Sequence, residues 1–198
     1  HMGAAYNTMS HFLPHMKRAL LSEDIKRELH AYDSFSVYKE HFERADTDDF
    51  LSKTQYADIK MYLVDDILTK VDRASMAHSL EVRVPLLDHE FMEFVATIPS
   101  GLKLKNGVGK YLLKQAANSM LPSQIVNRKK MGFSIPVESW FRKGLDTVFE
   151  EEVMSSGSYS KQYFKSRTLQ KMWNSHKSGR SLYGYQLWAI LMFEKWAR

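Results

Sequence analysis

The stretch IKMYLVDDILTKVDRASMAHSLEVRVPLLDHEFMEF, residues 59–94, decides the fold of this chain. Its first half repeats an apolar side chain every four residues, which is typical of an amphipathic α-helix. We expect that helix to run from about Thr47 to Ala77 and to bury its apolar face as ordinary core. The residues that carry the pattern are Ile59, Leu63, Ile67 and Val71, with Val64 and Leu68 widening the stripe.

The opposite face of this helix is charged. Asp66 precedes Lys70 by four residues, in the order that favours an ion pair on a helix surface. Asp65, Asp72 and Arg73 lie within the same two turns. A solvated, salt-bridged face is the simpler interpretation, because surface pairs are common and weak.

A run with few charges follows the helix. Pro85 keeps the preceding Val84 out of the helical region, and apolar residues surround Glu81 and Arg83. Such neighbours bury charge, and buried charge must be paired. We therefore expect Glu81 and Arg83 to be buried and paired. Asp88 precedes a second apolar stripe and is expected to be the N-cap of the next helix.

The segment LKLKNGVGK, residues 102–110, is expected to be a flexible loop before a further helix. Its two glycines allow a ligand to approach the backbone closely, and free N–H groups at a helix start favour anions. The pattern is not a Walker A loop, because Leu104 stands where glycine is needed and Tyr111 replaces serine or threonine. A hairpin loop with a solvated Lys110 is the simpler interpretation.

Composition limits the class of protein. The chain has 198 residues, of which 44% are hydrophobic, so it can bury a full core. It has no cysteine, which excludes disulfides, thiolate metal sites and cysteine nucleophiles. The net charge of +5 suits a phosphate-bearing small molecule as well as nucleic acid. No apolar run approaches the roughly 18 residues that span a bilayer.

The periodicity along the rest of the chain predicts a mainly α fold, since strand-type alternation never lasts more than a few residues. We expect residues 1–5 to be a cloning remnant and start. Residues 6–198 are expected to form a single helical lobe, with a minor break near the linker-like stretch 155–160. The aromatic stripe around Tyr38 is expected to be core.

The string from Asp65 to His89 closely resembles the synthetase domain of glutamine-hydrolysing asparagine synthases and their relatives. The resemblance continues through residues 107–110 and 128–133 to Leu187-Trp188, so it covers nearly the whole chain beyond about residue 50. It implies a helical C-terminal lobe of a larger α/β synthetase domain of the adenine-nucleotide α-hydrolase-like type. Within 128–133 we expect Gly132 to supply a turn and Phe133 to anchor the loop.

This family is understood to join the aspartate side-chain carboxylate to the α-phosphate of ATP with Mg²⁺, to release pyrophosphate, and to let ammonia from glutamine displace AMP. By resemblance, Lys110 takes the place of the catalytic lysine, which stabilises charge on the phosphate. Substrate or nucleotide binding is implied for Lys70, Arg73, Glu81 and Arg83. An architectural role, with a buried pair that locks the turn, is the alternative for the last three of these. Supporting roles are implied for Asp66 and Asp72, which would orient the basic side chains, and for Asp88. No metal ligand is expected in this chain.

Three features of the family do not occur in this sequence. They are the pyrophosphate-binding loop Ser-Gly-Gly-x-Asp-Ser, the acidic glycine-rich segment that helps hold magnesium, and the glutaminase domain with its cysteine. We therefore expect a fragment of a longer cytoplasmic synthetase, whose glutaminase domain and nucleotide-binding half are partners on the same polypeptide. The substrates implied are aspartate, ATP and glutamine. Alone, the chain is expected neither to catalyse nor to bind ATP tightly.

Two alternatives stay open. One is a relative that amidates or cyclises another carboxylate, as β-lactam synthetases do. The other is a non-catalytic helical binding module, for nucleic acid for example, whose affinity would fall steeply with salt. Under the main interpretation we expect no nucleic-acid or membrane partner, and an oligomer is compatible with the sequence.

Overall fold

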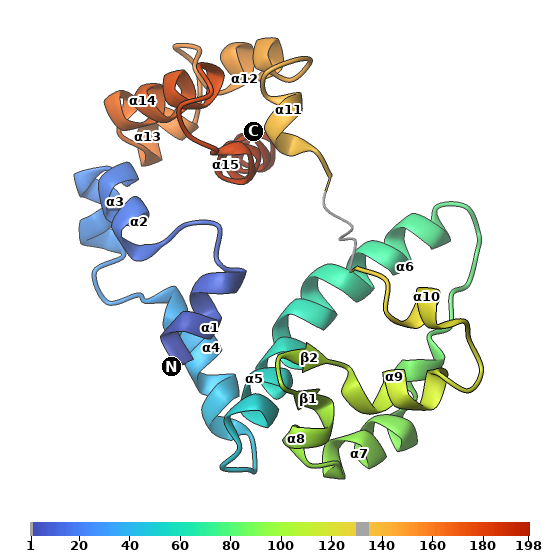
Figure 1. Cartoon of the computed structure of the whole chain (residues 1–198). Coiled ribbons are helices and arrows are strands. Elements are labelled where there is room, and N and C mark those ends of the chain that lie inside the picture. The colour runs from blue at the N-terminus through green and yellow to red at the C-terminus, as the bar shows by residue number, and fades with distance from the viewer. Residues whose placement is uncertain (1, 130–134) are drawn as a thin grey trace. The chain divides into compact units, whose positions relative to one another are not determined.

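The computed structural model describes residues 2–129 and 135–198 and is mainly helical, as the sequence predicts (Figure 1). Its elements divide into two compact units. Unit 1 contains residues 3–33 and 135–198, and unit 2 contains residues 34–129. The expectation that residues 6–198 form a single lobe stays a prediction.

Unit 1 joins two distant segments of the chain. The first segment carries α1 (Met2–Met9) from its second residue on, α2 (Pro14–Leu20) and α3 (Glu23–Glu28). The second carries α11 (Val137–Trp140), α12 (Asp146–Glu152), α13 (Ser160–Tyr163), α14 (Ser166–Lys177) and α15 (Gly184–Ala197). Backbone hydrogen bonds tie the segments together, because Ser22 N donates to Tyr163 O at 2.8 Å and Lys165 N donates to Leu20 O at 2.7 Å.

The core of unit 1 gathers around α14 and α15. The rings of Phe149 and Trp173 stack with their centres 4.8 Å apart, and Phe141 meets Phe149 edge to face. Each large side chain buried in this way contributes about 1.5–3 kcal/mol. The cluster consists of Leu20, Phe141, Phe149, Val153, Leu169, Met172, Trp173, Leu187, Ile190 and Leu191.

Unit 2 is a succession of helices with one hairpin. Its first helices are α4 (Ser34–Arg44), α5 (Phe50–Asp58), the π-helix η1 (Ile59–Leu68) and α6 (Thr69–Met76). The 3₁₀ turn η2 (Pro85–Leu87), α7 (His89–Thr97) and α8 (Ser100–Lys103) follow. The strands β1 (Leu104–Lys105) and β2 (Val108–Gly109) then pair antiparallel, before α9 (Tyr111–Ala117) and α10 (Ser123–Val126).

The long helix predicted from Thr47 to Ala77 forms, but it changes type inside. α5, η1 and α6 follow one another without a break from Phe50 to Met76. In the π-helix each N–H bonds the carbonyl five residues back instead of four, so residues four apart no longer align on one face. The carboxylate of Asp49 caps the start by accepting a hydrogen bond of 2.8 Å from Ser52 N.

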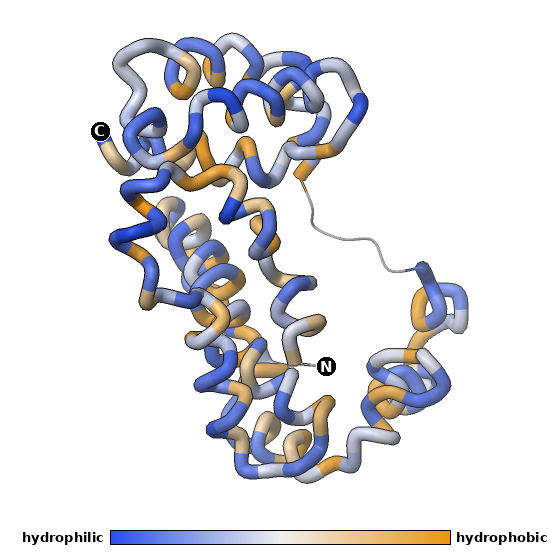
Figure 2. The backbone as a smooth tube through the Cα atoms, turned by 90° about the vertical axis from the view of Figure 1, so that its left-hand side faces the viewer, coloured by the Kyte–Doolittle hydropathy of each residue, from blue (hydrophilic) through white to orange (hydrophobic). Residues whose placement is uncertain are grey.

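The expectation that this helix buries its apolar face as core is wrong for the described structure. None of the residues in 59–68 is buried, and Val64 is 47% exposed. From residue 59 to residue 129 no side chain is buried, although apolar residues recur along the tube in Figure 2. Burial in unit 2 lies around α4 and α5, where the predicted aromatic core is confirmed by Tyr38 and Phe42.

Three further expectations concern loops and membranes. The stretch 155–160 lies inside unit 1, between α12 and the first turn of α13.

Gly132 and Phe133, for which the sequence predicts a turn and an anchor, lie outside the described residues. Within the described ranges, every helix is too short or too polar to cross a lipid bilayer.

Candidate functional site

Lys110 follows directly on a tight β-hairpin. Asn106 and Gly107 occupy the turn with φ values of 52° and 78°, the conformation that a two-residue turn of this type requires. Lys105 pairs with Val108 across the hairpin. The segment is therefore a defined hairpin, as in the simpler interpretation of the sequence, and not an irregular flexible loop. The signal was present, because Asn-Gly is the preferred dipeptide of this turn.

The backbone of Lys110 is left-handed, with φ 56° and ψ 35°. A non-glycine residue rarely adopts this conformation, which costs roughly 1–3 kcal/mol and persists only where the surroundings impose it. Lys110 occupies the N-cap position of α9, and its carbonyl accepts the hydrogen bond of Lys114 N at 2.9 Å. Such strain is concentrated at functional sites, so it favours a role for Lys110 beyond a solvated loop.

The amine of Lys110 is exposed and available. Among the described residues it has no hydrogen-bond, ion-pair or aromatic partner. Two neighbouring lysines are engaged: Lys103 Nζ donates to Ala96 O at 3.4 Å, and Lys105 Nζ lies 4.8 Å from the centre of the Tyr111 ring. The catalytic role that the resemblance implies for Lys110 stays a prediction.

The backbone beside Lys110 is open, as expected from the glycines. A methyl group added at Gly109 would meet no atom within 4 Å. A ligand can therefore approach the main chain of β2 closely. This space is what a phosphate group needs in order to accept hydrogen bonds from backbone N–H groups.

The charged face of the long helix is solvated. Lys70 Nζ lies 3.8 Å from Asp66 Oδ1, which confirms the pair that the sequence spacing predicts, and both side chains are more than half exposed. Arg73 and Asp72 are exposed on α6, and Asp72 forms no ion pair with any described residue. Asp66 thus contacts its base, whereas Asp72 does not.

Glu81 and Arg83 form an ion pair, but the expectation that the pair is buried is wrong. The side chain of Arg83 is 87% exposed and that of Glu81 is 68% exposed. The valines on either side do not cover them, because Val82 and Val84 are themselves 43% exposed. The pair stays solvated, and surface pairs of this kind contribute at most about 1 kcal/mol.

Asp88 has the role that the sequence predicts. Its carboxylate accepts a hydrogen bond of 3.1 Å from Phe91 N and caps the start of α7. A cap of this kind is worth about 1 kcal/mol of helix stability. Asp88 therefore supports the fold of the segment that follows the Glu81–Arg83 pair.

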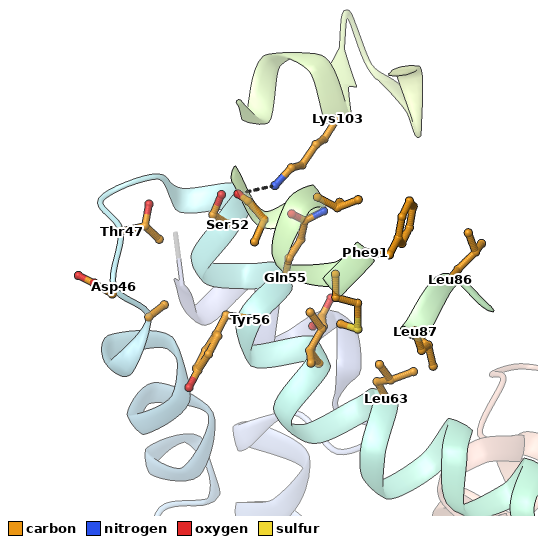
Figure 3. Close-up of a pocket in the computed structure, with 16 residues that line it drawn as sticks. Asp46, Thr47, Ser52, Gln55, Tyr56, Leu63, Leu86, Leu87, Phe91 and Lys103 are labelled. Carbon is orange, nitrogen blue, oxygen red and sulfur yellow. Dashed lines mark hydrogen bonds between the residues drawn. The ribbon is translucent and has the colours of Figure 1, made fainter. Parts of the chain in front are cut away.

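A cavity of about 610 Å³ lies between α5, η1 and α7, and none of the predicted site residues lines it (Figure 3). Its walls are mostly apolar, with Leu63 and Phe91 among them. Lys103 reaches its rim and hydrogen-bonds Ala96 O there. Burial raises the pKa of the Asp58 carboxyl in its wall. The volume is in the usual range for small-molecule pockets.

A second cavity, of about 420 Å³, includes one of the predicted residues. Asp72 lines it together with Thr69 and Ser75 of α6, and Val82 and Val84 form the facing wall. The segment that carries Glu81 and Arg83 is therefore packed beside α6. Of the residues predicted for the site, Asp72 is the one that the structure places at this cavity.

The described residues do not fit a magnesium site. Within 2–129 and 135–198, no three histidine, aspartate or glutamate side chains come together closely enough to hold a metal ion. Asp66 of the long helix is paired with Lys70, Asp65 and Asp72 are exposed, and Asp58 lies singly in the wall of the first cavity. We therefore assign these residues no role in holding a metal.

Comparison with known proteins gives one consistent result. The family model described as asparagine synthase matches residues 4–198. Asparagine synthetase [glutamine-hydrolyzing] 1 of Bacillus subtilis is 31% identical, over 89% of this chain and 28% of the relative. A putative asparagine synthetase of Mycobacterium tuberculosis is 32% identical over 75% of this chain and 22% of the relative. The asparagine synthetase of Gallus gallus is 40% identical over 41% of this chain.

The chain spans roughly a quarter of the length of the first curated relatives that it matches. No solved structure gives a significant match.

Proposed function

The chain belongs to the asparagine synthase family, and we propose that it supplies cationic side chains to a synthetase that activates a carboxylate with ATP. The substrate proposed is the side chain of aspartate. Its carboxylate oxygen attacks the α-phosphorus of ATP, and the bond from that phosphorus to pyrophosphate breaks. Ammonia released from glutamine then attacks the acyl carbon, and AMP leaves.

The left-handed, unpaired Lys110 is the observation that carries this proposal. Negative charge collects on the phosphate oxygens while the carboxylate attacks, and a nearby ammonium stabilises that charge more in the transition state than in the bound substrate. Lys110 is therefore assigned to the reacting phosphate. Lys70 and Arg73 are assigned to the nucleotide or to aspartate, with Asp66 holding Lys70 in place.

ATP supplies the adenylyl group that activates the carboxylate when bound, and Lys110, Lys70 and Arg73 are the residues of this chain that would contact it. Mg²⁺ belongs to the proposed reaction, but we assign it no ligand among the described residues. The glutaminase domain and the nucleotide-binding half of the same polypeptide are the proposed partners. The cytoplasm is the proposed location.

The exposed apolar side chains of unit 2 agree with such partners. Phe94 is 63% exposed, Leu86 is 56% exposed and Ile125 is 58% exposed. A surface this apolar normally lies against another part of a protein. Because the family's pyrophosphate-binding loop does not occur in this sequence, the isolated chain is proposed to lack tight ATP binding. Calorimetry is the direct check, and a micromolar dissociation constant for ATP would contradict this part of the proposal.

The test of the reaction compares two lysines one helical turn apart. Pyrophosphate release from ATP is measured with aspartate present, in the polypeptide that carries this chain. Lys110→Ala should lower kcat by about 10²–10³-fold, which is typical for loss of one group that stabilises transition-state charge. Lys114→Ala on the next turn of α9 is the matched control and should keep kcat. Full turnover in Lys110→Ala would refute the proposed function.

A further inference from the structure

Lys105 and Tyr111, which flank Lys110 in the sequence, contact each other. Lys105 ends β1, Tyr111 begins α9, and the ammonium of the one lies 4.8 Å from the ring centre of the other. A cation at this distance from the face of an aromatic ring is attracted by its electron density. The contact therefore links the hairpin before Lys110 to the helix after it.

This contact spans the strained residue. Lys110 connects two regular elements through a single left-handed conformation, and its side chain forms no cap with α9. A change in its φ or ψ would swing the hairpin relative to the helix. Because Lys105 is fixed by pairing with Val108 in the hairpin, its contact with Tyr111 opposes that swing.

The same contact gives the ammonium groups of Lys105 and Lys110 different roles. Lys105 and Lys110 are five residues apart, and either ammonium could approach a phosphate. The ring of Tyr111 holds the ammonium of Lys105, whereas that of Lys110 has no partner among the described residues. One defined cation is thus left at the end of the hairpin.

We propose that Lys105 and Tyr111 are positioning residues that hold Lys110 in the geometry of its reaction. This inference rests on the proposed function, since it assumes that Lys110 meets the reacting phosphate. Neither residue touches substrate in this proposal. Their effect is on how often the Lys110 ammonium is in the reactive position, and small displacements of a catalytic group are costly in rate.

The experiment uses two pairs of variants in the polypeptide that carries this chain. Tyr111→Leu and Lys105→Met each remove the contact, and each should lower kcat for pyrophosphate release about tenfold with little change in the KM for ATP. Tyr111→Phe and Lys105→Arg keep a ring and a cation, and each should restore kcat to within about twofold of the wild-type value.

Two further measurements separate positioning from general damage. The double variant, Tyr111→Leu with Lys105→Met, should be no slower than either single one, because both remove the same contact. Urea unfolding followed by circular dichroism should show that the variants remain folded under assay conditions.

The possible outcomes distinguish the positioning role of Lys105 and Tyr111 from the catalytic role of Lys110. Unchanged kcat in Tyr111→Leu, in a protein that Lys110→Ala inactivates, would overturn the inference and leave the proposed function intact. The inference would also be overturned if the two single effects multiplied in the double variant, or if Tyr111→Phe were as slow as Tyr111→Leu. Full turnover in Lys110→Ala would remove the proposed function itself.

Discussion

Gly184 N donates a hydrogen bond of 3.1 Å to Oε2 of Glu138, where the first turn of α15 meets α11. The approach is so close that a methyl group on Gly184 would lie 2.8 Å from Glu138 Cδ and 2.9 Å from Glu138 N. The second of these atoms is backbone and cannot move without shifting α11. Glycine is therefore required at this position by packing.

Gly184→Ala should destabilise unit 1 by about 1–3 kcal/mol, the usual cost of overpacking. All four tryptophans of the chain lie in unit 1, so their fluorescence during urea unfolding reports on this unit alone. Gly157→Ala is the matched control, because a methyl group there meets no atom within 4 Å. Equal midpoints for the two variants would show that the contact does not constrain the fold.

Glu194 should make unit 1 sensitive to acid. Burial raises the pKa of its carboxyl, but hydrogen bonds from Ser160, Ser158 and Tyr159 outweigh burial and bring the pKa below the ordinary value. The ionised Glu194 carboxylate therefore contributes its full stabilisation of unit 1 above the pKa of about 4.3 that it has in the unfolded chain. That stabilisation is lost as the pH falls through the lower pKa of the folded state. Removing a buried charge partner of this kind costs about 1.5–3 kcal/mol.

Glu194→Gln provides the measurement. Other carboxylates of the chain also have lowered pKa values, so the quantity to follow is the difference in unfolding free energy between wild type and variant. That difference should be largest at neutral pH and should shrink below about pH 4. A difference that stays constant as pH falls would contradict the assignment.

His176 should also make the stability of unit 1 depend on pH, but at a higher pH than Glu194 does. Burial lowers the pKa of this imidazole, with Arg142 adding to the effect and Glu138 opposing it. Its Nδ1 accepts a hydrogen bond of 3.1 Å from Tyr183 N, which requires the neutral ring. The unfolded state therefore binds the proton more readily, and stability should fall as pH drops below about 6.5.

His176→Gln should weaken unit 1 by about 1 kcal/mol near neutral pH, because one buried hydrogen bond is lost. It should also flatten the dependence of stability on pH between about 7 and 5. His15→Gln changes an exposed histidine of the same unit and should leave that dependence as in wild type. The urea midpoint at several pH values is the measurement, and a wild-type slope in His176→Gln would contradict the role given to this ring.

Lys110 offers a direct test of stored backbone strain. Lys110→Ala and Lys110→Gly both remove the amine, but only glycine adopts φ 56° without a steric cost. The glycine variant should be more stable than the alanine variant by about 1 kcal/mol, the reverse of their order inside a helix. Thermal unfolding followed by circular dichroism measures this. A more stable alanine variant would show that the left-handed conformation is not imposed.

Local patterns account for most of what was correct in the sequence-based predictions. Asp88 caps α7 and Asp66 pairs with Lys70, because caps and surface pairs depend on residues three or four positions apart. The mainly helical fold follows from periodicity for the same reason. The buried pair of Glu81 and Arg83 failed because burial depends on what else covers a segment, which neighbours in sequence do not specify.

The π-helix could not be predicted from the sequence. The apolar stripe from Ile59 to Val71 has the spacing of an α-helix, and periodicity alone does not separate the two helix types. The hydroxyl of Thr69 donates to Val64 O at 2.9 Å, five residues back, where the helix returns to the α type. Only the hydrogen bonds of the folded chain reveal that change.

The sequence by itself determined that the chain is mainly helical, that an aspartate caps α7, and which family the chain resembles. These properties reside in short runs of residues. The tertiary structure alone decided that Lys110 is left-handed, that Lys105 contacts the ring of Tyr111, and that Gly184 must lie against Glu138. The physical reason is that strain, aromatic contacts and close packing depend on where the folded backbone brings atoms together in space.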